Sequence, residues 1–322
     1  MLRNDLTTPM APGPSVSFKA AHLTGLVDQV STIIVGKREQ VALAVVCLLA
    51  SGHLLIEDVP GVGKTTLSQA LARSLGLSFS RVQFTSDLLP SDLIGVSVFE
   101  RQQEQFVFHP GPVFSQVVLA DEINRAGPRT QSALLEAMEE RQVSVDGQTH
   151  VLPHPFFVIA TQNPSDQLGT HPLPESQLDR FAMRLSLGYP DPSAERALLT
   201  GQDRRQSLLS LQAAMSLEDW QACQAQVDRI HVADNLLDYL QRLLTATRDG
   251  RWFALGLSPR AGLSLLRLAK ARALLQGRPH VSPEDLQALW VPATAHRLMP
   301  LPQSGRSAQA QARALLEGTP VP

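Results

Sequence analysis

The chain has 322 residues and a formal net charge of −2 at pH 7, and 43% of its residues are hydrophobic. This length suits one large or two modest globular domains, and the near-neutral charge gives no general attraction to nucleic acid or acidic membranes. The two cysteines, Cys47 and Cys223, are far apart in sequence and form no disulfide framework. A reducing compartment fits them, so we expect a cytoplasmic protein without a membrane segment.

The N-terminal part of the chain is predicted to be a tail followed by helices. Residues 1–16 mix prolines with polar residues and are expected to form a flexible tail. The pattern from Phe18 to Ser51 predicts helix, broken near residues 34–37. The apolar run at 41–50 is too short to span a bilayer, so it predicts a buried helix. A buried strand is expected at His53–Glu57.

A phosphate-binding loop follows this strand. Backbone N–H groups of a glycine turn and the positive end of the next helix dipole face one space, where a phosphate fits. Lys64 is expected to reach the β- and γ-phosphates, and the Thr65 hydroxyl to hold Mg²⁺. Asp58 stands where the general pattern has glycine. The loop and the start of the predicted helix Lys64–Leu75 comprise Val59, Pro60, Gly61, Val62, Gly63, Lys64, Thr65 and Thr66.

Further along, two carboxylates follow a predicted buried strand. Strands are expected at Ser80–Phe84 and 116–121, with a hairpin formed by Val96–Phe99 and Phe106–Phe108. The second strand ends in Asp121-Glu122, at the position where open α/β sheets bind their ligands. We expect Asp121 to bind Mg²⁺ through water and Glu122 to orient and polarise the attacking water.

The next elements complete a predicted parallel sheet. A helix is expected at Thr130–Arg141, a hairpin at Val143–Val151 around Asp146-Gly147, and strands at Phe156–Ala160 and Met183–Leu187. Strands separated by helices indicate a parallel α/β sheet. Asn163 follows the first of these strands and is a candidate hydrogen-bond donor to a γ-phosphate or to the attacking water. The alternative is that Asn163-Pro164 only begins a turn.

Two arginines are candidates for contact with a phosphoryl group. Arg180 has the planar, permanent charge suited to a phosphoryl-transfer transition state in a neighbouring subunit. A salt bridge to Asp179 or Glu175 is the alternative for this arginine. Arg260 lies near the start of a predicted helix, from which we expect it to contact the γ-phosphate of its own subunit. Nucleotide state would then set the angle between two domains.

Beyond residue 190 the pattern becomes helical. Helical segments continue to about residue 299, and one more short helix is expected at Ala308–Glu317. We therefore expect an α/β nucleotide-binding core at 17–189, a helical lid domain at 190–300 and a C-terminal tail at 301–322.

Together these segments resemble the AAA+ ATPases, and within them the MoxR family, over roughly residues 18–300. The motifs that carry the resemblance lie at 57–65, 83–95, 120–126, 160–164, 173–181 and 258–261. The resemblance implies a P-loop AAA+ core with a helical lid, and Asp58 looks usual for this family. It assigns Lys64 and Thr65 to Walker A, Asp121 and Glu122 to Walker B, Asn163 to sensor 1, Arg180 to the arginine finger and Arg260 to sensor 2.

The resemblance also implies cofactors and partners. The cofactors are ATP and Mg²⁺, with Val35 and Gly36 as further candidate nucleotide contacts. The partners are identical subunits in a hexameric ring, a protein with a von Willebrand factor A domain and a client protein, whereas nucleic acid is not expected. Remodelling or maturation of the client, for example cofactor or metal insertion, is the implied activity. The alternatives are a nucleic-acid motor, a transcription activator, a magnesium-chelatase-like motor subunit and a nucleotide-gated scaffold with little turnover.

Overall fold

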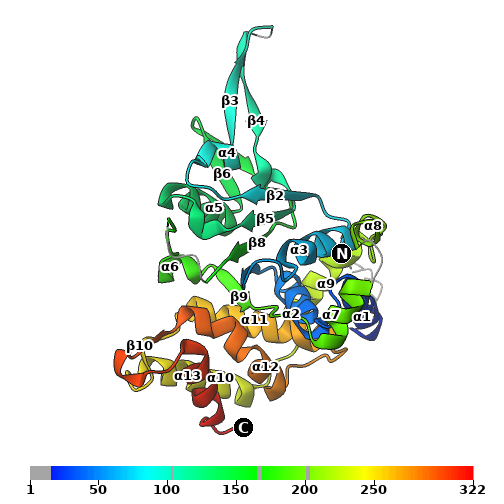
Figure 1. Cartoon of the computed structure of the whole chain (residues 1–322). Helices are drawn as coiled ribbons and strands as arrows, with labels where there is room; N and C mark the ends of the chain where they lie inside the picture. Colours follow the sequence, from blue (N-terminus) through cyan, green and yellow to red (C-terminus); the bar gives the residue numbers. More distant parts are fainter. Residues whose placement is uncertain (1–15, 103, 165–168, 201–203, 322) are drawn as a thin grey trace, which may run out of the picture.

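A five-stranded parallel sheet lies at the centre of the computed structural model, which describes residues 16–102, 104–164, 169–200 and 204–321 (Figure 1). The predicted parallel α/β sheet is confirmed, because every neighbouring pair of strands in it is parallel. The tail expected at 1–16 falls, except for its last residue, outside the described residues. In spatial order the strands are β2 (Phe79–Gln83), β5 (Val117–Asp121), β8 (Phe157–Gln162), β1 (His53–Glu57) and β9 (Phe181–Leu185).

Both faces of this sheet are covered, which is why its strands are continuous apolar runs. In β5, Val117 and Leu119 belong to one hydrophobic core, whereas Val118 and Ala120 belong to another. The first core includes apolar side chains of α1 (Val16–Ile33), α2 (Arg38–Leu49) and α3 (Lys64–Ser74). The second core includes α5 (Pro128–Glu140) and the short α4 (Pro90–Ile94). The expected break between the first two helices is confirmed at residues 34–37.

Two hairpins extend from the second face of the sheet, and both were predicted. They consist of β3 (Gly95–Glu100) with β4 (Gln105–Pro110), and β6 (Gln142–Val145) with β7 (Gln148–Val151). Asp146 and Gly147 have φ values of 50° and 78°, as a two-residue hairpin turn requires. The His150 ring stacks on Phe108 with centroids 3.9 Å apart. This contact links the hairpins, and β3–β4 projects well beyond the rest of the chain (Figure 1).

The C-terminal half is helical, as predicted, but it does not form a separate core. Trp220 packs edge-on against Phe157 of β8, with centroids 6.3 Å apart, so one apolar core continues from the sheet into these helices. The described helices are α7 (Pro192–Thr200), α8 (Arg204–Leu209), α9 (Leu217–Asp228), α10 (Asp234–Arg248), α11 (Pro259–Leu275), α12 (Pro283–Thr294) and α13 (Ala308–Glu317).

The end of the chain differs from the expected tail at 301–322. The predicted helix at Ala308–Glu317 is present as α13, and it packs against α12. Trp290 Nε1 donates a hydrogen bond to the Ala312 carbonyl oxygen at 2.8 Å, and Leu315 is buried. Because this burial fixes α13 to α12, the helix belongs to the helical part rather than to a tail. A small antiparallel pair, β10 (Phe253–Leu255) and β11 (Met299–Pro300), was not predicted.

Candidate active site

The loop between β1 and α3 has the backbone geometry of a phosphate-binding turn. Gly61 and Gly63 have φ values of 84° and 97°, a region that side-chain-bearing residues rarely adopt. Gly63 immediately precedes Lys64, the first residue of α3. The first N–H groups of that helix therefore face the loop without intrahelical partners, and they favour an anion there.

Asp58, the departure from the general pattern, fixes this loop to the end of β9. One of its carboxylate oxygens accepts hydrogen bonds from Ser186 Oγ at 2.9 Å and from the Gly188 N–H at 2.6 Å. The other accepts from the Val59 N–H at 2.8 Å. Burial raises the pKa of the Asp58 carboxyl, but these hydrogen bonds outweigh it and the net pKa is lowered. Asp58 is thus a structural anion of the loop.

Lys64 joins the carboxyl ends of β1 and β8. Its Nζ donates to the Asp58 carbonyl oxygen and to Asn163 Oδ1, both at 2.6 Å. The lysine is 8% exposed, so its ammonium is held at the mouth of the loop. Asn163, predicted from its position after a strand, therefore lies beside the lysine rather than only beginning a turn.

Asp121 is held by Thr161 and Arg81, two residues that were not predicted as site residues. Thr161 Oγ1 donates to Asp121 Oδ1 at 2.6 Å, and the same hydroxyl accepts from the Glu122 N–H at 2.9 Å. Arg81 forms an ion pair with Asp121 Oδ2 at 2.7 Å. One buried hydroxyl thus orients both acidic residues of the predicted pair.

Glu122 is restrained from three directions. Its backbone has a φ of 56°, and its Oε2 accepts from Gln83 Nε2 at 2.8 Å and pairs with Arg125 Nε at 3.1 Å. Asn163 Nδ2 donates to the other carboxylate oxygen at 3.4 Å. Asp58, Lys64, Asn163, Glu122 and Gln83 therefore form one hydrogen-bonded series along the carboxyl edge of the sheet.

The predicted metal ligands fit Mg²⁺ in their chemistry. Thr65 and Asp121 supply a hydroxyl and a carboxylate, the hard oxygen donors that this ion prefers, and Mg²⁺ usually takes its other ligands from water and phosphate. Among the described residues there is no cluster of three or more His, Cys, Asp or Glu side chains that could hold a metal alone. Arg81 already places a cation against Asp121, which shows that the carboxylate position suits positive charge.

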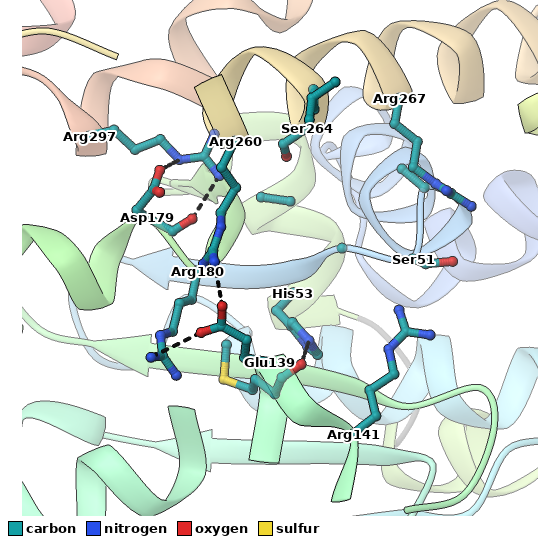
Figure 2. A pocket seen from close by; sticks show the side chains of 15 residues that line it. Ser51, His53, Glu139, Arg141, Asp179, Arg180, Arg260, Ser264, Arg267 and Arg297 are labelled. Atoms are coloured by element: carbon teal, nitrogen blue, oxygen red, sulfur yellow. Dashed lines mark hydrogen bonds and ion pairs between the residues drawn. The ribbon is translucent and has the colours of Figure 1, made fainter. Parts of the chain in front are cut away.

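Arg180 and Arg260 lie together, but at the opposite edge of the sheet. Both pair with Glu139 near the end of α5, Arg180 at 3.0 Å and Arg260 in a close contact. They line a cavity of about 380 Å³ together with Ser51 and His53, which precede or begin β1 (Figure 2). The hydrogen bond from Arg260, together with the charge of Arg180, lowers the pKa of the Glu139 carboxyl.

This placement differs from the expectation for Arg260 and from the alternative considered for Arg180, and it leaves the finger role of Arg180 a prediction. Arg260 was expected at the nucleotide of its own subunit, but β1 separates its cavity from the loop after Glu57. At a rise of ~3.3 Å per residue, the strand alone spans roughly 13 Å. Arg180 was expected either as a finger or as a partner of Asp179 or Glu175, and in the described structure its acidic partner is Glu139. Local sequence signals could not place Arg260, because the packing of the helical part against the sheet determines which edge the start of α11 faces. They also could not show that Arg180 pairs with Glu139, which is 41 residues earlier in the chain.

Val35 and Gly36 are far from Lys64 in sequence, and their loop packs against the segment that follows β9. A Cβ added to Gly36 would come within 2.9 Å of the Ala194 Cβ, so this loop abuts the start of α7. Lys37 Nζ donates to the Tyr189 carbonyl oxygen at 2.7 Å. Gly188, which bonds Asp58, is thus next to the segment that the 35–37 loop contacts.

Comparison with known proteins identifies the family. A model of the ATPase family associated with various cellular activities (AAA) matches residues 53–183, and one of the AAA lid domain matches 245–317. The chain is 42% identical over 302 residues to Chaperone MoxR1 of Mycobacterium tuberculosis, covering 90% of this chain and 79% of MoxR1. The chain belongs to the MoxR family of AAA+ ATPases. As a MoxR-family ATPase, it binds a nucleotide and hydrolyses ATP.

Two other similar proteins cover most of the chain. The uncharacterized protein YeaC of Bacillus subtilis is 44% identical over 299 residues, covering 92% of this MoxR-family chain and 93% of YeaC. A crystal structure of a candidate ATPase from Cytophaga hutchinsonii has a TM-score of 0.86 and 34% identity, covering 95% of this chain and 97% of that one.

Within the described ranges, no helix has both the length and the apolar character to cross a bilayer.

Proposed function

We propose that this MoxR-family ATPase hydrolyses ATP between identical subunits and uses the cycle to remodel a client protein. One observation supports the interfacial site above all others. Lys64 and Glu122 lie at the carboxyl edge of the sheet, whereas Arg180 and Arg260 lie at the opposite edge. A single nucleotide bound at Lys64 cannot meet both sets, so the two arginines complete the site of a neighbouring subunit.

Each residue at the carboxyl edge has a chemical role in this proposal. The N–H groups of residues 59–66 and the Lys64 ammonium bind the phosphates, and Val35 and Gly36 line the side toward the base. Thr65 and Asp121 would hold Mg²⁺, which neutralises charge on the β- and γ-phosphates. Glu122 accepts a proton from the attacking water, and Asn163 orients that water or the γ-phosphate.

Glu139 is the acidic partner of both arginines at the opposite edge. It holds Arg180 and Arg260 side by side, so the two guanidinium groups stay close despite their like charge. Phosphate oxygens of a neighbour's ATP carry more negative charge than one carboxylate and can bind arginine through two parallel hydrogen bonds, whereas Glu139 offers one oxygen to each arginine. They therefore compete with Glu139 for both arginines when subunits come together in a ring, which the family resemblance suggests is hexameric.

The hairpins support a client-remodelling role. At the end of β3–β4, Phe99 and Phe106 are 50% and 73% exposed and pack against each other. Exposed apolar residues of this size commonly mark protein interaction sites, and a relative over most of the chain is named a chaperone. From the family resemblance we also propose a partner protein with a von Willebrand factor A domain. A cytoplasmic location fits the two cysteines, Cys47 and Cys223, which are both free.

A nucleic-acid motor is less well supported. The β6–β7 hairpin, residues 142–151, contains Asp146 and no lysine or arginine, so it offers no charge to a phosphate backbone. DNA binding that weakens with salt and DNA-stimulated ATP turnover would reverse this ranking.

The position of Arg260 tests the interfacial site. Arg260→Ala subunits and Lys64→Ala subunits should each be inactive, and mixing them should restore turnover, because some sites then have an intact Lys64 facing an intact Arg260. Turnover that stays absent in rings shown to contain both variants would mean that Arg260 acts within its own subunit. The client is approached separately, by capture on Glu122→Gln protein held with ATP.

A further inference from the structure

The backbone on both sides of Arg180 is held by one buried arginine of the helical part. Arg297 Nη2 donates to the carbonyl oxygens of Asp179 at 3.1 Å and of Phe181 at 2.9 Å. Its Nε lies 3.2 Å from Asp179 Oδ1. Figure 2 shows Arg297 reaching Asp179 directly above Arg180. A single guanidinium thus binds the residue before Arg180 and the residue after it.

Two more residues of the helical part reinforce this contact. His296 Nε2 donates to the Phe181 carbonyl oxygen at 2.8 Å. Ser258, the N-cap of α11, donates through Oγ to Asp179 Oδ2 at 3.1 Å. Since α11 also carries Arg260, Asp179 connects the backbone of Arg180 to the helix of the second arginine.

The burial of Arg297 shows that this contact is more than a surface ion pair. Its side chain is 3% exposed, against 29% for Arg180. Burial lowers the pKa of Arg297 to about 10, while the Asp179 carboxylate acts to raise it, so the group stays charged at neutral pH. A charge buried this deeply is costly unless it is paired and hydrogen-bonded. Nη2 makes the hydrogen bonds of this group, and both go to the segment that carries Arg180, while the Asp179 carboxylate supplies the opposite charge.

We propose that Arg297 is a positioning residue, through which the helical part fixes Arg180 for contact with the neighbouring subunit's nucleotide. This inference rests on the proposed interfacial site. Nη2 of Arg297 binds both carbonyl oxygens while Nε of the same rigid, planar group faces the Asp179 carboxylate. A lysine ammonium is a single point of charge on a flexible stem, so it cannot hold both contacts in these directions. A rotation of α12 and the 295–297 turn against the sheet would therefore displace Arg180 and, through Asp179 and Ser258, Arg260 as well.

The first test is Arg297→Lys, measured as kcat and KM for ATP. We expect kcat to fall roughly 10- to 100-fold, the loss typical of a catalytic group displaced by about 1 Å. KM should change little, because the subunit's own nucleotide site is intact. Arg278→Lys is the matched control, since Arg278 binds the fully buried Asp285 within the helical part. This control should keep the wild-type kcat, and an equal loss in both variants would overturn the proposal.

Mixed rings separate positioning from misfolding. Arg297→Lys subunits mixed with Lys64→Ala subunits should regain turnover, because the second kind supplies a correctly held Arg180. Asp179→Asn, which leaves the two carbonyl bonds possible, should lose less kcat and also be restored by mixing. An unchanged kcat in both the Arg297 and Asp179 variants, or no recovery in confirmed mixed rings, would overturn the proposal.

The mixing experiments distinguish a failure of the Arg297 role from a failure of the proposed interfacial site. If Arg180→Ala mixed with Lys64→Ala recovers turnover but Arg297→Lys does not, only the positioning role of Arg297 fails. If Arg180→Ala also fails to recover, the interfacial site itself is wrong.

Discussion

Thr161 offers a sharp test of how the two acidic residues are held. Its side chain is fully buried, and its one hydroxyl donates to Asp121 Oδ1 and accepts from the Glu122 N–H. Thr161→Val keeps the shape and removes both hydrogen bonds. The lost bond to a charged oxygen is worth about 1.5–3 kcal/mol, and an unpaired buried N–H costs about 1–3 kcal/mol. Together these losses should lower the free energy of unfolding by about 2.5–6 kcal/mol.

The catalytic effect should exceed what the stability loss explains. With Asp121 and Glu122 free to shift, kcat should fall roughly 10- to 100-fold under conditions where the variant remains folded. Urea denaturation gives the stability and steady-state ATP turnover gives kcat. Thr161→Ser is the control, because it keeps the hydroxyl and loses only a methyl group, worth about 1 kcal/mol. A valine variant with wild-type kcat, or a serine variant as slow as valine, would refute this reasoning.

Two further predictions concern the same edge of the sheet. Glu122→Gln should bind ATP with near wild-type affinity yet lose turnover, since the amide cannot accept a proton from water; wild-type turnover would exclude this role. Asp58→Asn should lower the free energy of unfolding by about 1–3 kcal/mol at pH 7. Because the folded-state pKa of Asp58 is lowered, the wild type's advantage is present above the ordinary carboxyl pKa and lost as pH falls below it. Denaturant midpoints for the two proteins that fail to converge in acid would contradict that assignment.

The sequence predicted the parts of the site that follow from local pattern. A strand, a glycine turn and a helix predict the phosphate loop, and the Asp121-Glu122 pair is recognisable because it ends an apolar run. The carboxyl ends of parallel strands lie at one edge of a sheet. Asn163, which follows a predicted strand, could therefore also be placed at the same edge as Lys64.

The residues that were missed depend on contacts between segments far apart in sequence. Gln83, Arg81 and Thr161 reach Asp121 or Glu122 only once β2, β5 and β8 pair in register. Gln83 and Thr161 belong to the motifs at 83–95 and 160–164, but nothing in the local pattern indicates that their side chains bind the acidic pair. Asp58 was noticed as a departure, but its partners lie after β9.

The two arginines illustrate the same limit on a larger scale. Arg260 was assigned to its own subunit because its helix start was recognisable, but the packing of α11 against the core decides which edge it faces. Glu139, which pairs with both arginines, looks like any acidic residue near the end of an amphipathic helix.

The central claim is that one subunit's Lys64 works with another subunit's Arg180. The most direct measurement is ATP turnover in mixtures of Arg180→Ala and Lys64→Ala subunits across the full range of ratios, with mixed assembly confirmed independently. The account predicts near-zero turnover for each variant alone and a maximum at intermediate ratios, where competent pairs are most frequent. Turnover that stays near zero at every ratio in confirmed mixed assemblies would contradict it.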